Sequence, residues 1–462
     1  MIDLRDLREN PDRYREGLTA KGGDAAMIDR LIEVDAELRK LTSRHEELTA
    51  EKNRIGKEIG QLAGRLKKAE GDEKASLQET MRQLQGRPND IKAEQSDLQR
   101  RIEPLDAERD ALLLEAPQPP DPDVPRGGSA EDNVEVRRWM PEGFEVDKPF
   151  ADSRGFEPAD HITLMTNLGM VDMERGAKIS GARSYVLVGD GFRLHQAVLR
   201  CAFDYMTGEH GFVPLSAASL VRDEMMVGTG FFPHGRDQAY AIANPTGEGY
   251  GLALTGTGEV GLMGYHADEL LDGGSLPRCY TTLSPCYRRE AGAAGKDTAG
   301  LYRIHQFEKV EQVVICRADE AESRAWHTKM IGYVETLLQR LGLPYRLLQC
   351  CTGDLGPKNA DMIDIECWMP SRGDRDTGDA PTGDWGETHS ASRLYGYQCR
   401  RLNIRYKDPQ SGKNTVAHSL NNTVAASPRI LIPLVEMHQT GDGGINIPAP
   451  LQPYMNGQQR IG

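Results

Sequence analysis

SPCYRREAGAAGKDTAGLYRIHQFEKVE, residues 284–311, places Arg288 and Arg303 on either side of a loop rich in glycine and alanine. The carboxylates Glu290 and Glu311 lie just inside and just after that loop, and Phe307 follows the second arginine. A guanidinium fork suits phosphate oxygens, a carboxylate accepts hydrogen bonds from an amine, and an aromatic ring stacks on a base. The stretch therefore has the parts to hold a nucleoside triphosphate, although it lacks a P-loop string. The plainer alternative is a surface hairpin with ordinary salt bridges.

Upstream, residues 31–112 carry two series of side chains at alternating three- and four-residue steps, the pattern of a heptad seam. The short break AEGDEKA between the series predicts two helices that fold back into an antiparallel coiled-coil hairpin. Gly86, Pro88 and Pro104 lie inside the second helix, and an interior proline removes a helical hydrogen bond. We therefore expect kinks or a break near residues 86–89 and 103–104.

Charge on this arm is uneven. The stretch 52–68 has one acid, Glu58, and six basic residues, which are Lys52, Arg54, Lys57, Arg65, Lys67 and Lys68. A solvated helix face is the plain interpretation of such a run. On a chain whose net charge is −14, a projecting basic stretch favours a polyanion as the partner of these six side chains.

Composition limits the remaining possibilities. The chain has 462 residues, and neither its N-terminus nor any later window has the apolar run of a signal peptide or a membrane span. We therefore expect a cytoplasmic protein with no membrane partner. The eight cysteines form no CxxC pair, which predicts the absence of zinc. The proline-rich stretch 116–132 is interpreted as a linker, and the short β-rich runs beyond it (SYVLV, QVVIC, RLNIRY) predict an α+β domain around a largely antiparallel sheet.

Two further motifs carry side chains that fit small polar ligands. TGTGEVGLMGYH contains Thr257 and Glu259, which would point to one side of a strand and hold an ammonium or hydroxyl group, although a turn is the alternative. GETHSAS contains Glu387 and Ser390, whose oxygens suit a phosphate-bound Mg²⁺. We interpret His389, inside the same motif, as a packing or surface histidine.

HSLNNTVAASPRILIPLVEMHQ, residues 418–439, places Thr423 and Arg429 before an apolar helical run. Arg429 is a candidate clamp for a γ-phosphate, with a solvent-exposed arginine in a first turn as the alternative.

Together, these segments and the hairpin resemble the bacterial-type seryl-tRNA synthetases, which are class II aminoacyl-tRNA synthetases. Residues 284–311 resemble motif 2 of that class, LNNTVAASPRILIPLVE resembles motif 3, and TGE at 257–259 resembles the family's serine-site triplet, usually TAE. The resemblance covers essentially the full length. It implies a tRNA-binding helical arm at 1–115, a linker at 116–132 and a class II catalytic domain at 133–462. The stretch 371–386, longer than usual for the family, is interpreted as a mobile acidic surface insert.

The resemblance also implies a role for each site residue. Arg288, Glu290, Arg303 and Arg429 would be catalytic, with Arg288 on the α-phosphate, Glu290 on the adenine amine and the other two on the γ-phosphate. The implied ATP site comprises Arg288, Arg289, Glu290, Arg303, Ile304, Phe307, Glu387, Thr388, His389, Ser390 and Arg429. The implied serine site comprises Thr257, Gly258, Glu259, Arg288, Glu311 and Thr423. Glu387 and Ser390 would hold Mg²⁺, and the six basic residues of the arm would bind tRNA.

The implied activity is that of a serine–tRNA ligase acting as a homodimer on ATP, L-serine and serine tRNA, with selenocysteine tRNA as a further family substrate. Seryl-adenylate forms first, and the 3′-terminal ribose of tRNA then takes the seryl group. Two alternatives stay open at this point. One is a serine-activating paralogue that passes serine to a carrier protein, and the other is a non-catalytic RNA-binding paralogue.

Overall fold

The computed structural model describes residues 1–243, 251–292, 300–373 and 383–462. It divides into two compact units. The helical arm comprises Leu4–Glu16 and Asp24–Ala116, and the sheet unit comprises Met1–Asp3, Gly17–Gly23 and Pro117–Gly462. The stretch predicted to be a linker is packed against the sheet unit, since the backbone N–H groups of Gln118 and Asp121 donate to Pro357 and Ala360, both at 2.8 Å.

The predicted insert at 371–386 falls largely on residues 374–382, which lie outside the described residues. Its last residues, 384–386, begin a strand of the main sheet, where Trp385 is buried against Trp368.

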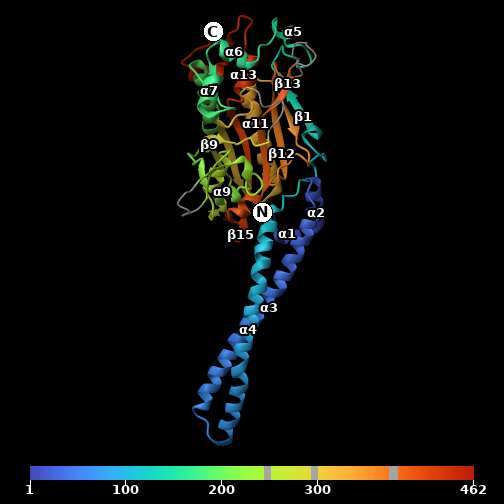
Figure 1. The fold of residues 1–462 in the computed structure, drawn as a ribbon, viewed down its shortest axis with the longest axis vertical. Coiled ribbons are helices and arrows are strands. Elements are labelled where there is room, and N and C mark those ends of the chain that lie inside the picture. The colour runs from blue at the N-terminus through green and yellow to red at the C-terminus, as the bar shows by residue number, and fades with distance from the viewer. Residues whose placement is uncertain (244–250, 293–299, 374–382) are drawn as a thin grey trace. The chain divides into compact units, whose positions relative to one another are not determined.

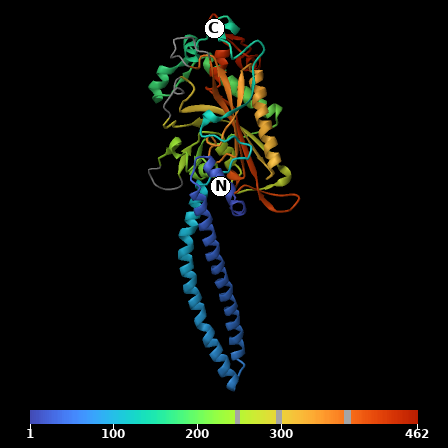
Figure 2. The same ribbon diagram turned by 90° about the vertical axis from the view of Figure 1, so that its right-hand side faces the viewer.

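Two long helices form the arm, α3 (Ala26–Leu66) and α4 (Gly71–Glu115), preceded by the short α1 (Leu4–Glu9) and α2 (Pro11–Ala20). Figures 1 and 2 show α3 and α4 running side by side as a hairpin. The predicted seam is confirmed, because Leu41, Leu48 and Ile55 of α3 are buried with Ile91 and Leu98 of α4 in one cluster.

The alternative of a break in the second helix is wrong, because α4 continues through Pro88 and Pro104. Pairing with α3 stabilises α4 and so compensates for the backbone hydrogen bonds that the prolines cannot make. Arg87 donates to Glu51 at 2.8 Å beside the first proline, and Arg30 donates to Glu108 at 2.7 Å one turn beyond the second.

Within the described residues, eight strands form the main sheet, in the order β1-β11-β12-β13-β16-β10-β9-β4. All neighbours are antiparallel except β4 and β9, which confirms the predicted largely antiparallel sheet. Their bounds are β1 (Val134–Trp139), β4 (Val213–Pro214), β9 (Arg278–Tyr287), β10 (Gln306–Cys316), β11 (Tyr345–Gln349), β12 (Asp361–Met369), β13 (Asp384–Tyr395) and β16 (His418–Ser427).

Smaller sheets lie beside it. Two of them have three strands each: β5 (Leu220–Arg222), β7 (Leu252–Leu254) and β6 (Tyr240–Ile242) form one, and β15 (Asn414–Val416), β14 (Arg405–Lys407) and β8 (Leu270–Asp272) form the other. Two more have two strands each, which are β2 (Val171–Asp172) with β3 (Val186–Leu187) and β17 (Ile445–Asn446) with β18 (Arg460–Ile461). The β-rich runs named above fall on β3, β10 and β14, although the last run begins inside a helix, α12 (Tyr397–Arg401).

Helices cover the two faces of the sheet differently. On one face, α8 (Asp190–Asp204) and α11 (Glu320–Arg340) join the large core cluster, and their His195 and Met330 bond to Glu308 and Gln312 of β10. The other face carries α10 (Glu259–Gly264) and α12, which pack on Val313 and Ile315. The other α-helices in the described part of the chain are α5 (Phe150–Arg154), α6 (His161–Asn167), α7 (Met173–Ser180), α9 (Asp223–Gly228) and α13 (Leu431–Met437).

Candidate active site

A cavity on the second face of the sheet gathers most of the side chains that the sequence singled out. Fourteen predicted site residues line it: Thr257, Glu259, Arg288, Glu290, Arg303, Ile304, Phe307, Glu311, Glu387, Thr388, His389, Ser390, Thr423 and Arg429. Gly258 and Arg289 are outside this lining, and Arg289 is exposed. The cavity also has lining residues that sequence reasoning missed, among them Phe231, Lys309, Asn421 and Ser427.

Strand β10 supplies one edge of the cavity through its alternation. Side chains two apart on a strand share a face, so Phe307, Lys309 and Glu311 form a row. Period-two spacing was the signal that would have found Lys309, which lies between two residues already predicted to bind ligand.

A β-bulge places the residues of GETHS. Three positions apart, Glu387 and Ser390 of a regular strand would face opposite sides of the sheet. Opposite Ile365 and Glu366, the register with β12 shifts between His389 and Glu387, so Thr388 is the extra residue. This shift returns Glu387 and Ser390 to one face, and both line the cavity.

The expectation that Thr257 and Glu259 share a strand is wrong, and the alternative of a turn holds. Glu259 is the first residue of α10, and its N–H lies 3.3 Å from the Thr257 hydroxyl oxygen, to which it donates. Between them, Gly258 packs so closely on Thr282 that a Cβ would stand 2.4 Å from the Thr282 methyl group. Glycine in place of the family's usual alanine is therefore required by the neighbouring side chain.

At the end of the cavity assigned to ATP, the arginines already have partners. The Arg303 guanidinium donates to Glu290 at 3.1 Å, and Glu290 has a left-handed backbone with φ of 50°. Arg288 lies over the Phe307 ring, 5.3 Å from its centroid. Arg429 donates to the backbone carbonyls of Tyr302 and Glu387, both at 3.1 Å.

At the end assigned to serine, two buried lysine–glutamate pairs lie side by side. Lys309 bonds to Glu311 and donates to the Thr257 hydroxyl at 2.8 Å, while that hydroxyl donates to Glu311 at 3.2 Å. The second pair joins Glu259 to Lys358, which sequence reasoning also missed. Lys358 is 99 residues from its partner, and no local pattern marks it.

His389 is part of the wall and carries no charge at neutral pH. Its two ring nitrogens bond to the Thr388 hydroxyl at 2.8 Å and to the Val424 carbonyl at 3.2 Å. Burial lowers the pKa of His389 to about 3. The interpretation of this residue as a packing histidine is confirmed by that burial, although its ring also lines the cavity.

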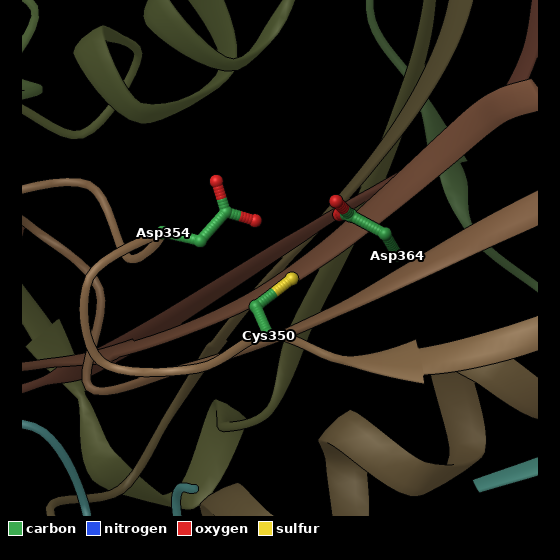
Figure 3. Close-up of side chains that lie close together, drawn as sticks. All are labelled: Cys350, Asp354 and Asp364. Carbon is green, nitrogen blue, oxygen red and sulfur yellow. The ribbon is translucent and has the colours of Figure 1, made fainter. Parts of the chain in front are cut away.

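Behind Ser390, a small acidic cluster contains Cys350, Asp354 and Asp364, whose sulfur and oxygen atoms lie within 4.8 Å of one another (Figure 3). Asp364 is paired with Ser390 in the register of β12 and β13. Burial, together with the nearby Glu387 carboxylate, raises the pKa of Asp364 well above its usual value.

On the arm, all six basic residues predicted to bind tRNA are exposed. Lys52 and Lys57 border a shallow surface hollow beside Pro88. Among the described residues, Arg65 is the one member of the six in an ion pair, 3.4 Å from Glu73. These six cations therefore face solvent, whereas other arginines of the arm, such as Arg87 and Arg30, pair with its carboxylates.

Comparisons with known proteins agree with this geometry. Residues 1–115 match the seryl-tRNA synthetase N-terminal domain, and residues 242–438 match the core domain of class II tRNA synthetases for G, H, P, S and T. The chain is 40% identical to a serine–tRNA ligase of Deinococcus radiodurans, covering 100% of this chain and 99% of that protein. A serine–tRNA ligase of Kocuria rhizophila is 38% identical, with 99% of each chain covered.

Solved structures agree as well. A seryl-tRNA synthetase of Pyrococcus horikoshii complexed with ATP has a TM-score of 0.81 and 34% identity, covering 100% of this chain and 99% of that one. A serine–tRNA ligase of Naegleria fowleri in complex with AMP has a TM-score of 0.82 and 28% identity, covering 100% and 98%. Across the described residues, none of the helices is long and apolar enough to span a bilayer.

Proposed function

The chain belongs to the seryl-tRNA synthetase family and joins serine to tRNA, and we propose which residues bind each substrate and act in each step. One cavity joins arginines suited to phosphate with a small polar pocket at Thr257 and Glu311. This juxtaposition of a triphosphate site and an amino-acid site is the observation that carries the proposal.

ATP binds at the arginine end in a bent form. Glu290 accepts hydrogen bonds from the adenine amine, and Phe307 stacks on the base. Arg303, which contacts Glu290 in the described structure, binds the γ-phosphate, so the triphosphate folds back toward the base. Arg288 leaves its position over Phe307 to bind the α-phosphate.

Magnesium fits the oxygens that the bulge in β13 brings to one face. Glu387 and Ser390 offer hard oxygen donors beside Arg429, whose guanidinium lies 3.5 Å from the Glu387 carboxylate. When bound with ATP, the ion neutralises phosphate charge. The absence of zinc stays a prediction from the sequence.

Serine binds with its ammonium at Glu311 and its hydroxyl among Thr257, Glu259 and Thr423. Lys309 occupies part of this region in the described structure, bonded to Glu311 and Thr257. The serine ammonium therefore competes with the Lys309 ammonium for Glu311, and the lysine moves aside as the substrate enters.

Reaction proceeds by two displacements. A serine carboxylate oxygen attacks the α-phosphorus, the bond to the β-phosphate oxygen breaks, and pyrophosphate leaves. A ribose hydroxyl at the tRNA 3′ end then attacks the seryl carbonyl carbon, loses its proton, and AMP leaves. Neither step needs a protein nucleophile, because positioning and charge neutralisation by Arg288 and its neighbours lower both barriers.

The arm at 1–115 binds serine tRNA through Lys52, Arg54, Lys57, Arg65, Lys67 and Lys68. Contacts are to backbone phosphates and shape rather than to base identity. We also assign residues 116–132 as a linker and residues 133–462 as the catalytic domain. We further assign a two-fold homodimer and a cytoplasmic location, where charged tRNA is used.

Charging of tRNA distinguishes this function from transfer to a carrier protein. Purified protein, ATP, magnesium and labelled serine should acylate a serine tRNA transcript with a long variable arm. The same transcript without that arm should be a poor substrate. Adenylate formation without acylation of any tRNA would contradict the proposal.

A further inference from the structure

Glu259 stands out among the cavity residues because its carboxylate is already crowded. Lys358 donates to both oxygens, at 2.9 and 2.7 Å. The same Oε1 atom also accepts from Gln398 at 2.6 Å and from Asn421 at 2.5 Å. Among the described residues, Oε1 therefore has three donors and Oε2 has one. Since a carboxylate oxygen accepts about two hydrogen bonds, Oε2 retains room for one more donor.

Lys358 reaches this carboxylate from behind the cavity wall. Its ammonium lies 4.1 Å from the centre of the Phe231 ring, and Phe231 lines the cavity whereas Lys358 does not. The lysine side chain is 14% exposed and that of Glu259 is 4% exposed. Lys358 therefore acts on a ligand through Glu259 rather than by touching it.

The loop that carries Lys358 is fixed on both sides. The Lys21 ammonium donates to the carbonyls of Gly356 at 2.9 Å and Asn359 at 2.6 Å. Gln118 donates its backbone N–H to Pro357 at 2.8 Å. Burial lowers the pKa of Lys21 to about 7, yet the carbonyl contacts remain available to either form of the amine. These contacts hold the loop that places the Lys358 ammonium beside the Glu259 carboxylate.

Charge balance then decides which side chain the pocket accepts. An unpaired buried carboxylate would attract an ammonium group strongly. With Lys358 in place, a cation that enters the pocket meets a neutral ion pair. It loses hydration free energy and gains little ionic attraction in exchange. A hydroxyl needs only the open acceptor position on Oε2.

We propose that Lys358 is a specificity-determining positioning residue that makes the pocket select a side-chain hydroxyl over a side-chain amine by neutralising Glu259. This inference rests on the proposed function, because it takes the pocket at Thr257, Glu259 and Glu311 as the serine site.

Pyrophosphate exchange with two amino acids tests the inference. L-2,3-diaminopropionate carries an amine where serine carries its hydroxyl, so it serves as the probe. In Lys358→Met, the serine KM should rise by about tenfold or more while the ATP KM stays constant. The ratio of kcat/KM for serine to that for diaminopropionate should fall by about a hundredfold.

Matched variants separate charge from structure. Lys358→Arg keeps the charge and should keep most of the discrimination. Lys148→Met breaks an exposed pair in which the lysine ammonium lies 2.8 Å from Glu145. This variant should match the unmodified protein in its serine KM and in the ratio of the two kcat/KM values. The double variant Lys358→Met with Glu259→Gln removes both charges, so the gain toward diaminopropionate should vanish.

A Lys358→Met protein that loses activity on both amino acids equally, with an unchanged ratio, would overturn the inference and leave a structural role. Should that variant fail to fold, Glu259→Gln alone gives a second test. It leaves the lysine cation unopposed and should reject diaminopropionate more strongly, and an unchanged ratio contradicts the inference. If the unmodified protein shows no exchange with serine, the proposed function itself fails.

Discussion

The cavity and the helical arm use charge in opposite ways. Lys309 and Arg303 line the cavity, Lys358 lies behind its wall, and each of the three contacts a glutamate. The two lysine pairs are almost fully buried. On the arm, the six basic side chains are exposed. Buried charges act individually because little solvent screens them, whereas exposed ones act together and weaken as salt rises. Single substitutions should therefore be severe in the cavity and mild on the arm.

The largest effect is expected at Arg288. Replacing it by alanine removes the cation assigned to the α-phosphate, where charge builds up during attack. Serine-dependent pyrophosphate exchange should fall by about a thousandfold. Thermal unfolding should change little, because Arg288 is exposed. Arg82→Ala, an 82% exposed arginine of the arm, is the control. A similar loss in both variants would remove the contrast between the two regions.

A smaller effect concerns acid stability. Burial lowers the pKa of His389 to about 3. Between the usual histidine pKa and that value, the unfolded chain binds a proton at this residue and the folded chain does not. The contribution is complete at neutral pH and is lost as pH falls. At pH 4.5 it should cost about 2–3 kcal/mol of unfolding free energy. Urea unfolding of His389→Gln should show a shallower loss of unfolding free energy between pH 7 and 4.5 than the unmodified protein shows. Parallel pH curves would contradict the assignment.

Glu387 should have an intermediate effect of about tenfold. Glu387→Gln weakens a magnesium ligand without emptying the site of oxygen donors, so the magnesium concentration for half-maximal exchange should rise by about that factor. Titration of exchange against free magnesium at fixed ATP measures it. Glu145→Gln at the exposed Lys148 pair is the control. An unchanged magnesium dependence would contradict the assignment of the metal to the bulge in β13.

The smallest effect belongs to the arm. Lys67→Glu with Lys68→Glu should raise the tRNA KM by several-fold. The slope of log affinity against log salt should fall by about 0.9 for each tRNA phosphate that the arm no longer neutralises. Exchange without tRNA should be unchanged. Lys67→Arg with Lys68→Arg keeps the charge and serves as the control. Equal damage to exchange and acylation would refute a role confined to tRNA.

Sequence reasoning succeeded where a local period or a compact motif carries the signal. The heptad seam through Leu48 and Ile91 predicted the hairpin, and the stretch 284–311 predicted residues of one cavity. It failed where distant segments decide. Pairing with α3 keeps α4 helical through Pro88 and Pro104. Counting helix-breaking residues in the sequence leaves out the stabilisation that this pairing supplies.

The same limit applies within the site. A bulge at Thr388, set by the neighbouring strand, brings Glu387 and Ser390 to one face. The strand expected at Thr257 and Glu259 is a turn entering α10. Lys358 could not be found, because it meets Glu259 only after the chain folds.

Pyrophosphate exchange across a panel of amino acids, with no tRNA present, tests the central claim most directly. The account predicts ATP-dependent exchange with L-serine and only weak exchange with threonine, alanine or 2,3-diaminopropionate. Exchange that prefers another amino acid, or none with any, would contradict the assignment of the cavity as a serine-activating site.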